Sequence, residues 1–273
     1  MASGAAPDMM QAMETHDIEP ENWLRKTTPA ATVVIFRHDP LGGPPQILMV
    51  ERNASLKFAG GATVFPGGKI DEADRELAAR IGGDLDDMAA RVAAVRETLE
   101  ETGLVVGIDG VVDGMLAAQA RRMLISGGDL APVLDAFGWS LAPERLVPFA
   151  RWWPKHRTER IFDTRFYLAD LGTGAVDIEV DATENRHLFW ASAKGALDLA
   201  EKGKIRVIFP TRRNLERLAL FGSFGDAKVH AEATPAGTIS PFIEKRDGQP
   251  WLMIPENLGY PVLGEPLEMA QRG

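Results

Sequence analysis

The sequence predicts an α/β (α+β) fold in which helices cover a mixed sheet. Short β-branched and apolar runs alternate along the chain with segments of helical periodicity, which is typical of a sheet packed between helical layers. Hydrophobic residues make up 45% of the 273 residues, so the chain can bury a substantial core.

The first part of the chain is expected to form strands that lead into one long helix. Residues 31–36 and 47–50 are apolar runs joined by a turn rich in Pro and Gly, and a third short strand covers residues 63–65. A helix is expected at about 88–102, because apolar residues recur there at helical spacing. A further strand is expected at residues 104–108.

The remainder of the chain alternates both kinds of element. Helices are expected at residues 115–125, 130–137, 194–201 and 211–220, and strands at residues 146–153, 161–168 and 188–190. This order again favours a mixed sheet between two helical layers.

Composition divides the chain into three parts. Residues 1–29 are a polar N-terminal segment, and residues 30–221 form the main domain, with insertions at about 71–87 and 109–140. Residues 222–273 are a C-terminal extension with frequent Gly and Pro, which we interpret as an added hairpin region or a dimer arm.

Charge and cysteine content exclude several classes of function. The formal net charge of −9 argues against a nucleic acid as the main partner. The absence of cysteine excludes disulfides, thiolate metal sites and a cysteine nucleophile. No secretory signal and no apolar stretch of ~18 residues is evident, so we expect no membrane contact and a cytoplasmic location.

The most informative stretch is the end of the helix at 88–102. Its apolar stripe consists of Met88, Val92, Val95 and Leu99. Glu97, Glu100 and Glu101 lie on the other side, in the last turns before Gly103. Carboxylates at a helix C-terminus cost about 0.3–1 kcal/mol each, because the backbone dipole is already negative there. This arrangement predicts a compensating cation, and a divalent metal ion is the natural candidate.

A glycine-rich turn precedes this helix. Val64 and Phe65 enter a Pro-Gly-Gly-Lys sequence that ends at Lys69. Gly67 and Gly68 let the backbone approach an ion or a phosphate closely. Mg²⁺ takes hard oxygen ligands and is often held jointly by carboxylates and substrate phosphates, so turn and glutamates together indicate a Mg²⁺ (or Mn²⁺) and diphosphate site.

These residues resemble the box of the Nudix hydrolases, whose usual pattern is G-x5-E-x7-R-E-U-x-E-E-x-G-U, with U a bulky apolar residue. The second half of the pattern matches at Arg96, Glu97, Glu100, Glu101, Gly103 and Leu104. Thr98 replaces the usual aliphatic residue. Gly68 and Arg96 are 28 positions apart, twice the spacing of the pattern, so the segment between them is interpreted as an inserted loop or short helix. No residue is assigned to the first glutamate of the box.

Further segments are similar to the coenzyme A and acyl-coenzyme A diphosphatases of the mammalian peroxisomal type. They are residues 64–68, residues 160–168, the stretch from Glu184 to Trp190, and residues 210–215. The resemblance covers about residues 30–220 and implies a Nudix-type α/β/α sandwich with helical insertions and a C-terminal extension. It also implies metal-dependent hydrolysis of a nucleoside diphosphate derivative, most closely coenzyme A or acyl-coenzyme A, to 3′,5′-ADP and (acyl-)phosphopantetheine.

The resemblance assigns roles to individual residues. Metal ligands would be Glu97, Glu100, Glu101 and the carbonyl of Gly68, and substrate contacts would come from Gly67, Lys69, Arg160 and Arg165. Arg96 would orient a glutamate, and either Glu97 or Glu184 would take the proton of the attacking water. The metal would neutralise phosphate charge and activate that water.

Alternatives remain at several of these positions. The three glutamates could be a solvated acidic helix face, Glu184 a plain surface acid, and Arg160 with residues 155–157 a solvated basic turn. The substrate could instead be ADP-ribose or a dinucleotide, and the chain could be a non-catalytic ligand sensor with the same fold. A small-molecule partner is expected in each case, and a homodimer is possible.

Overall fold

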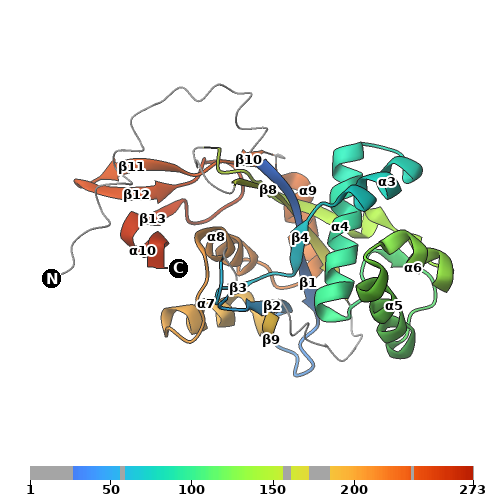
Figure 1. Ribbon diagram of the computed structural model, residues 1–273. Coiled ribbons are helices and arrows are strands. Elements are labelled where there is room, and N and C mark those ends of the chain that lie inside the picture. The colour runs from blue at the N-terminus through green and yellow to red at the C-terminus, as the bar shows by residue number, and fades with distance from the viewer. Residues whose placement is uncertain (1–26, 56–58, 156–160, 172–184, 235–236, 273) are drawn as a thin grey trace.

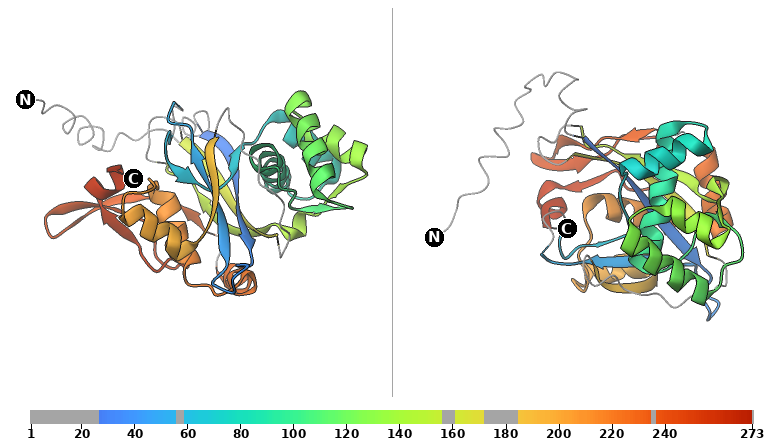
Figure 2. Two further views of the ribbon diagram at one scale, coloured as in Figure 1. Left: turned by 90° about the horizontal axis from the view of Figure 1, so that it is seen from below. Right: turned by 45° about the vertical axis from the view of Figure 1, so that its right-hand side comes forward.

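The computed structural model describes residues 27–55, 59–155, 161–171, 185–234 and 237–272 of the chain. An eight-stranded mixed sheet lies at the centre, and helices cover both of its faces (Figures 1 and 2). The expected α/β class is therefore confirmed.

The central sheet combines strands that lie far apart in the sequence. Its main path is β10 (Thr238–Ile239), β7 (Val147–Trp152), β8 (Ile161–Asp170), β1 (Thr27–Arg37), β2 (Gln46–Arg52) and β3 (Thr63–Val64). Off this path, β4 (Gly67–Lys69) pairs with β1, and β9 (Asn185–Ser192) pairs with β2. The β1–β8 and β10–β7 pairs are parallel, and the other pairs are antiparallel.

One face of the sheet carries the helices that hold the glutamates. They are α3 (Glu72–Ile81), α4 (Leu85–Thr102), α5 (Gly114–Gly127) and α6 (Leu130–Phe137). The segment after Gly68, for which the sequence predicts an inserted loop or short helix, contains α3. Helix α4 begins at Leu85, earlier than predicted, because the Asp84 side chain caps it by accepting a hydrogen bond from the Asp87 amide at 2.7 Å.

The strand predicted at 104–108 is mostly absent. Only β5 (Ile108–Asp109) forms, and it pairs with β6 (Ser140–Leu141), outside the central sheet. Leu104 is nonetheless fully buried, so its apolar character reflects packing beneath α4 and not a strand. The short 3-10 helix η1 (Pro143–Arg145) then leads back into β7.

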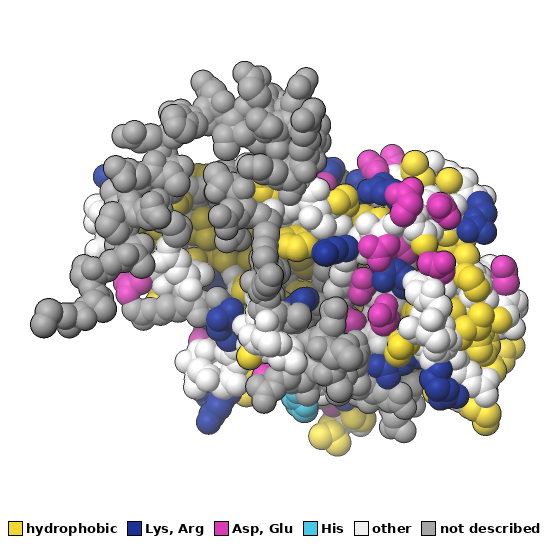
Figure 3. All heavy atoms as spheres, in the orientation of Figure 1, with side chains coloured by type: hydrophobic (Ala, Val, Ile, Leu, Met, Phe, Trp, Pro, Cys, Tyr) yellow, Lys and Arg dark blue, Asp and Glu magenta, His cyan; other side chains and the backbone are white. Residues whose placement is uncertain are grey.

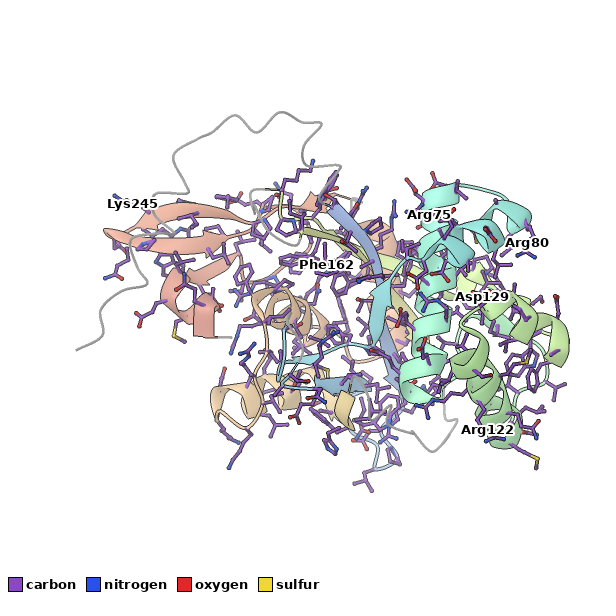
Figure 4. The ribbon with its side chains drawn as sticks, in the orientation of Figure 1. Arg75, Arg80, Arg122, Asp129, Phe162 and Lys245 are labelled. Atoms are coloured by element: carbon purple, nitrogen blue, oxygen red, sulfur yellow. The ribbon has the colours of Figure 1, made fainter. Side chains whose placement is uncertain are left out.

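The second face is covered by α7 (Ala193–Glu201), α8 (Phe209–Leu218) and α9 (Phe224–Ala233). Beyond them, β11 (Phe242–Arg246), β12 (Gln249–Met253) and β13 (Gly264–Pro266) form a separate three-stranded sheet that ends in α10 (Leu267–Arg272). This small sheet projects to the left of the main one in Figure 1. Lys245 lies near the tip of its hairpin (Figure 4).

The C-terminal residues also complete the main core. Ile239 of β10 pairs with Trp152 of β7, and the Trp152 indole donates a hydrogen bond to the hydroxyl of Tyr260 at 3.2 Å. The Tyr260 hydroxyl in turn donates to Asn214 of α8 at 2.6 Å. All three side chains are buried, so this contact fixes the extension on the second face.

Alternation along β1 divides the core in two. Ala31, Val33 and Ile35 pack towards α4, whereas Val34 and Phe36 pack towards α7, α8 and α9. Both clusters consist mainly of fully buried aliphatic side chains. Among the described residues, none of the helices has the length and hydropathy needed to cross a bilayer.

Candidate active site

The three glutamates of α4 differ in exposure. Gly103 ends the helix with φ of 74°, and its amide bonds the Leu99 carbonyl at 3.0 Å. Glu101 is 4% exposed, whereas the side chains of Glu97 and Glu100 are 15% and 36% exposed. The three glutamates therefore do not form a uniformly solvated acidic helix face, which was the alternative interpretation of this stretch.

The buried carboxylates meet the glycine turn. The amide of Gly67 donates a hydrogen bond to Oε2 of Glu101 at 3.0 Å. Strand β4 is held against β1, with Gly67 opposite Thr32 and Gly68 opposite Ala31. A Cβ on Gly68 would overlap the Glu97 carboxylate, 2.6 Å from its Oε2. The turn and the glutamates therefore form one compact site, and glycine is required for their close approach.

Arg96 connects this site to α3. Its guanidinium donates to both carboxylate oxygens of Asp74 at 2.9 Å, to the Lys69 carbonyl at 2.9 Å and to Glu97 Oε1 at 3.0 Å. Arg96 and Asp74 are 4% and 1% exposed. Such a bidentate pair is strong and fixes the orientation of both groups.

Asp74 is the residue that the sequence analysis missed. It lies six positions after Gly68, where the Nudix pattern has its first glutamate, and it also accepts from the Asp71 amide at 2.9 Å. The spacing G-x5-D was the available signal. This signal is weak for two reasons. Asp replaces the usual Glu, and the distance from Gly68 to Arg96 is twice that of the pattern, so Asp74 cannot be aligned with the first glutamate from the position of Arg96. The added residues lie after Asp74, in the rest of α3 and the start of α4.

Burial changes the ionisation of two groups. The pKa of Glu97 is raised to about 8, mainly by burial and also by the charges of Glu101 and Glu100, which together outweigh the lowering effect of Arg96. Burial alone would lower the pKa of Arg96, but the Asp74 hydrogen bond and the nearby acidic charges outweigh it, so that pKa is raised. Arg96 is already committed to Asp74, which explains why it does not keep Glu97 fully ionised.

A second arginine reaches the end of α4 from outside the box. Nε of Arg121, on α5, donates to the Glu100 carbonyl at 2.9 Å, and Arg121 is only 7% exposed. Its neighbour Arg122 lies on the outer side of α5 (Figure 4). Since α4 has no basic residue in its last turn, Arg121 supplies part of the positive charge that the adverse dipole predicted.

The other predicted site residues are placed as follows. The Lys69 side chain is exposed next to the site. Arg165 aligns with Ala31, but its guanidinium donates to the Asp86 carbonyl in the first turn of α4, at 3.1 Å. Asp86 precedes Glu97 by 11 residues, which is about 16 Å of helix, so Arg165 is not brought to the glutamates. Arg160 and Glu184 lie outside the described residues.

The donor set is suited to a hard divalent cation. Glu97 and Glu101 converge on the Gly67–Gly68 backbone, and Figure 3 shows further acidic side chains over α3 and α4. Among the residues that the structure describes, no group of three or more Asp, Glu, His or Cys side chains is close enough to hold an ion alone.

Comparison with known proteins agrees with the geometry of the site. Residues 26–123 match the model of the NUDIX domain. Together with its similarity to hydrolases of known structure, this supports a Nudix pyrophosphohydrolase acting on a nucleoside diphosphate derivative.

The chain is similar to several solved structures. A NUDIX hydrolase from Alicyclobacillus acidocaldarius is 27% identical, with a TM-score of 0.63, over 74% of this chain and 96% of that chain. A MutT protein from Methanosarcina mazei Go1 is 16% identical (TM-score 0.38, 70% and 92% covered). The NUDIX domain of Shewanella oneidensis NrtR, complexed with ADP ribose, is 14% identical (TM-score 0.36, 72% and 94% covered). Comparison with curated proteins gives no match.

Replacing Gly68 by Ala should separate activity from stability. The new Cβ meets the end of the flexible Glu97 side chain, so the fold can adapt while the carboxylate moves. We expect kcat/KM to fall about 100-fold, as for a displaced catalytic group, with an almost unchanged urea midpoint. Gly67→Ala should instead lower the midpoint, because its Cβ meets the β1 backbone and φ is 151°. Equal loss of stability in both variants would contradict this reading.

The raised pKa of Glu97 predicts a pH-dependent stability. A carboxyl whose pKa rises from 4.5 to about 8 on folding stabilises the folded state fully below pH 4.5, and this contribution is lost as the pH rises through 8. In chelator, the free energy of unfolding should therefore fall between pH 5 and 8 relative to Glu97→Gln, by at most about 1.4 kcal/mol per pH unit. Urea denaturation of both proteins over this range measures the difference. A constant difference would show that Glu97 is ionised throughout.

Proposed function

We propose that the chain hydrolyses the diphosphate bond of coenzyme A or acyl-coenzyme A, giving 3′,5′-ADP and (acyl-)phosphopantetheine. The observation that supports the chemistry is the contact of Glu97 and Glu101 with the Gly67–Gly68 turn. The choice of substrate rests on the resemblance of residues 160–168 and 210–215 to coenzyme A diphosphatases.

The residues divide into those that hold the cation and those that hold the substrate. Glu97, Glu100, Glu101 and the Gly68 carbonyl would hold Mg²⁺ or Mn²⁺, and the ion would supply positive charge to the diphosphate. Substrate contacts are proposed for Gly67 and Lys69 beside the turn and for Arg160, whereas Arg165 would contact only a part of the substrate distant from the glutamates. The exposed ammonium of Lys69 next to the turn is suited to a phosphate oxygen.

The reaction consumes one water molecule. The water oxygen attacks one phosphorus, the bridging P–O bond breaks, and the departing phosphate keeps the bridging oxygen. Glu97 or Glu184 would accept the proton of the water. Arg96 contributes by positioning, because its bond to Glu97 Oε1 is anchored by the pair with Asp74.

Product analysis tests this function. Purified protein is incubated with coenzyme A, acetyl-coenzyme A, ADP-ribose or NADH, each with Mg²⁺ or with chelator, and the products are identified by mass. Metal-dependent release of 3′,5′-ADP from coenzyme A is the expected result. Cleavage of ADP-ribose or NADH alone would keep the chemistry and discard the coenzyme A proposal. No cleavage of any compound would favour the non-catalytic sensor.

A further inference from the structure

A cavity of about 470 Å³ lies on the second face of the sheet, away from α4. Its walls come from β2, β3, the segment between α7 and α8, α8 itself and the C-terminal β13 and α10. These elements lie together to the left of β1 in Figure 1. The volume is within the range of about 300–1,000 Å³ that small-molecule sites occupy.

Cations predominate among the charged groups of this cavity. They are Lys204, Arg206 and Arg212, against the acids Glu51 and Glu265. We call this site the basic cavity. The chain as a whole carries a net charge of −9, so a cavity in which cations outnumber acids differs from the average charge of the protein.

The two acids of the basic cavity, Glu51 and Glu265, offset its three cations only in part. Glu265 is already bonded to the buried Arg213 at 3.0 Å, and its contact with Arg212 is longer, at 3.8 Å. Lys204 and Arg206 are exposed and have no ion-pair partner in the part of the chain that the structure describes. Two cations therefore remain free to contact an anionic ligand.

The basic cavity is linked to the glycine turn through one short stretch of chain. Thr63 lines the cavity, and its amide donates to the Arg206 carbonyl at 2.6 Å. The Thr63 hydroxyl is buried without a hydrogen-bond partner among the described residues. Four residues further on is Gly67, whose amide bonds Glu101, and four residues span at most about 14 Å. Because β3 ends the strand order, this stretch lies at an edge of the sheet, where a nucleotide derivative can reach around from one face to the other.

We propose that the basic cavity binds a phosphate monoester on the nucleoside half of the substrate, separate from the diphosphate that is cleaved. The proposal rests on the diphosphatase function above and adds a property to it. Lys204 and Arg206 select substrates that carry this additional phosphate. Arg212 and Glu265 also line the cavity, and Glu265 is held by its ion pair with the buried Arg213.

Equilibrium binding of two nucleotides tests the proposal without hydrolysis. The pair 3′,5′-ADP and AMP differ by one phosphate monoester, and neither contains a diphosphate. Wild-type protein should bind 3′,5′-ADP about 10-fold more tightly than AMP, because the additional phosphate gains charged hydrogen bonds; a tenfold change in Kd corresponds to about 1.4 kcal/mol. The Lys204→Ala/Arg206→Ala double variant should bind both with nearly equal affinity.

The matched control is Lys202→Ala. Lys202 is an exposed lysine at the end of α7 that does not line the cavity, so this variant should keep the wild-type preference. Because Lys204 and Arg206 are exposed, the double variant should keep the wild-type melting temperature. Equal binding of both nucleotides by wild-type protein, no binding of either, or an unchanged preference in the double variant would overturn the proposal.

Hydrolysis separates this proposal from the function on which it rests. With coenzyme A and dephospho-coenzyme A as substrates, the double variant should raise KM only for coenzyme A, with kcat unchanged. Cleavage of both substrates with no such change would keep the diphosphatase function and refute the cavity assignment. The opposite outcome is also distinguishable. If neither substrate is cleaved, but wild-type protein prefers 3′,5′-ADP and the double variant loses this preference, the cavity assignment stands and coenzyme A is refuted as the substrate.

Discussion

The Glu101→Gln variant is expected to lose at least about 100-fold in kcat/KM, equivalent to about 2.7 kcal/mol of transition-state stabilisation. Glu101 is the most buried of the three glutamates, and it contacts the turn directly through the Gly67 amide. Gln removes the negative charge that a divalent cation would need. Its carbonyl oxygen can still accept the Gly67 amide, so the protein should remain folded.

Steady-state kinetics with Mg²⁺ and a melting curve measure this effect. Glu76→Gln, which neutralises an exposed acid on α3, is the matched control and should leave both unchanged. Full activity in Glu101→Gln would show that catalysis does not need the Glu101 carboxylate. A large drop in melting temperature would instead show that the charge serves the fold.

Replacing Asp74 by Ala should have the largest effect on stability, about 3–5 kcal/mol. The change leaves the guanidinium of Arg96, 4% exposed, without its main partner. It also frees Arg96 to shift relative to Glu97, so activity should fall in the fraction that stays folded. Urea denaturation near neutral pH measures the loss.

The control for this variant is an ion pair in the same pair of helices. Asp86→Ala breaks the contact with Arg75 at 3.1 Å, where the side chains are 68% and 30% exposed. An exposed pair contributes at most about 1 kcal/mol, so this variant should stay close to wild type. A loss below 1 kcal/mol for Asp74→Ala would mean that Arg96 finds another carboxylate, with Glu97 the nearest.

The long helix and its glycine stop were predictable because they depend on local patterns. The apolar stripe of α4 and the αL conformation at Gly103 need no knowledge of distant contacts. The strand expected at 104–108 was wrong because apolar periodicity reports burial and not backbone pairing. Leu104 is fully buried in the core cluster that contains the apolar face of α4, and it lies outside every strand that the structure describes.

The site was predictable only in its contiguous half. Glu97, Glu100 and Glu101 share one helix with Arg96, and sequence spacing placed them together. Asp74 and Arg121 reach the same helix from α3 and α5, and their contacts depend on how those helices pack. The basic cavity was not predictable from the sequence. Its cations come from α8 and the segment before it, and its other walls come from β2 and β3, more than 100 residues earlier in the chain. Sequence spacing does not show that these segments meet.

The attachment of β10 to β7 limits how far this protein can be shortened. The segment that matches the NUDIX domain ends at residue 123, yet Trp152 packs against Tyr260, well beyond it. A fragment that stops before β10 would open the edge of β7 and uncover an indole that now lies in the core. The minimal expressible fragment is therefore set by Tyr260, and proteolytic trimming from that end should proceed no further than α10 and the strand before it.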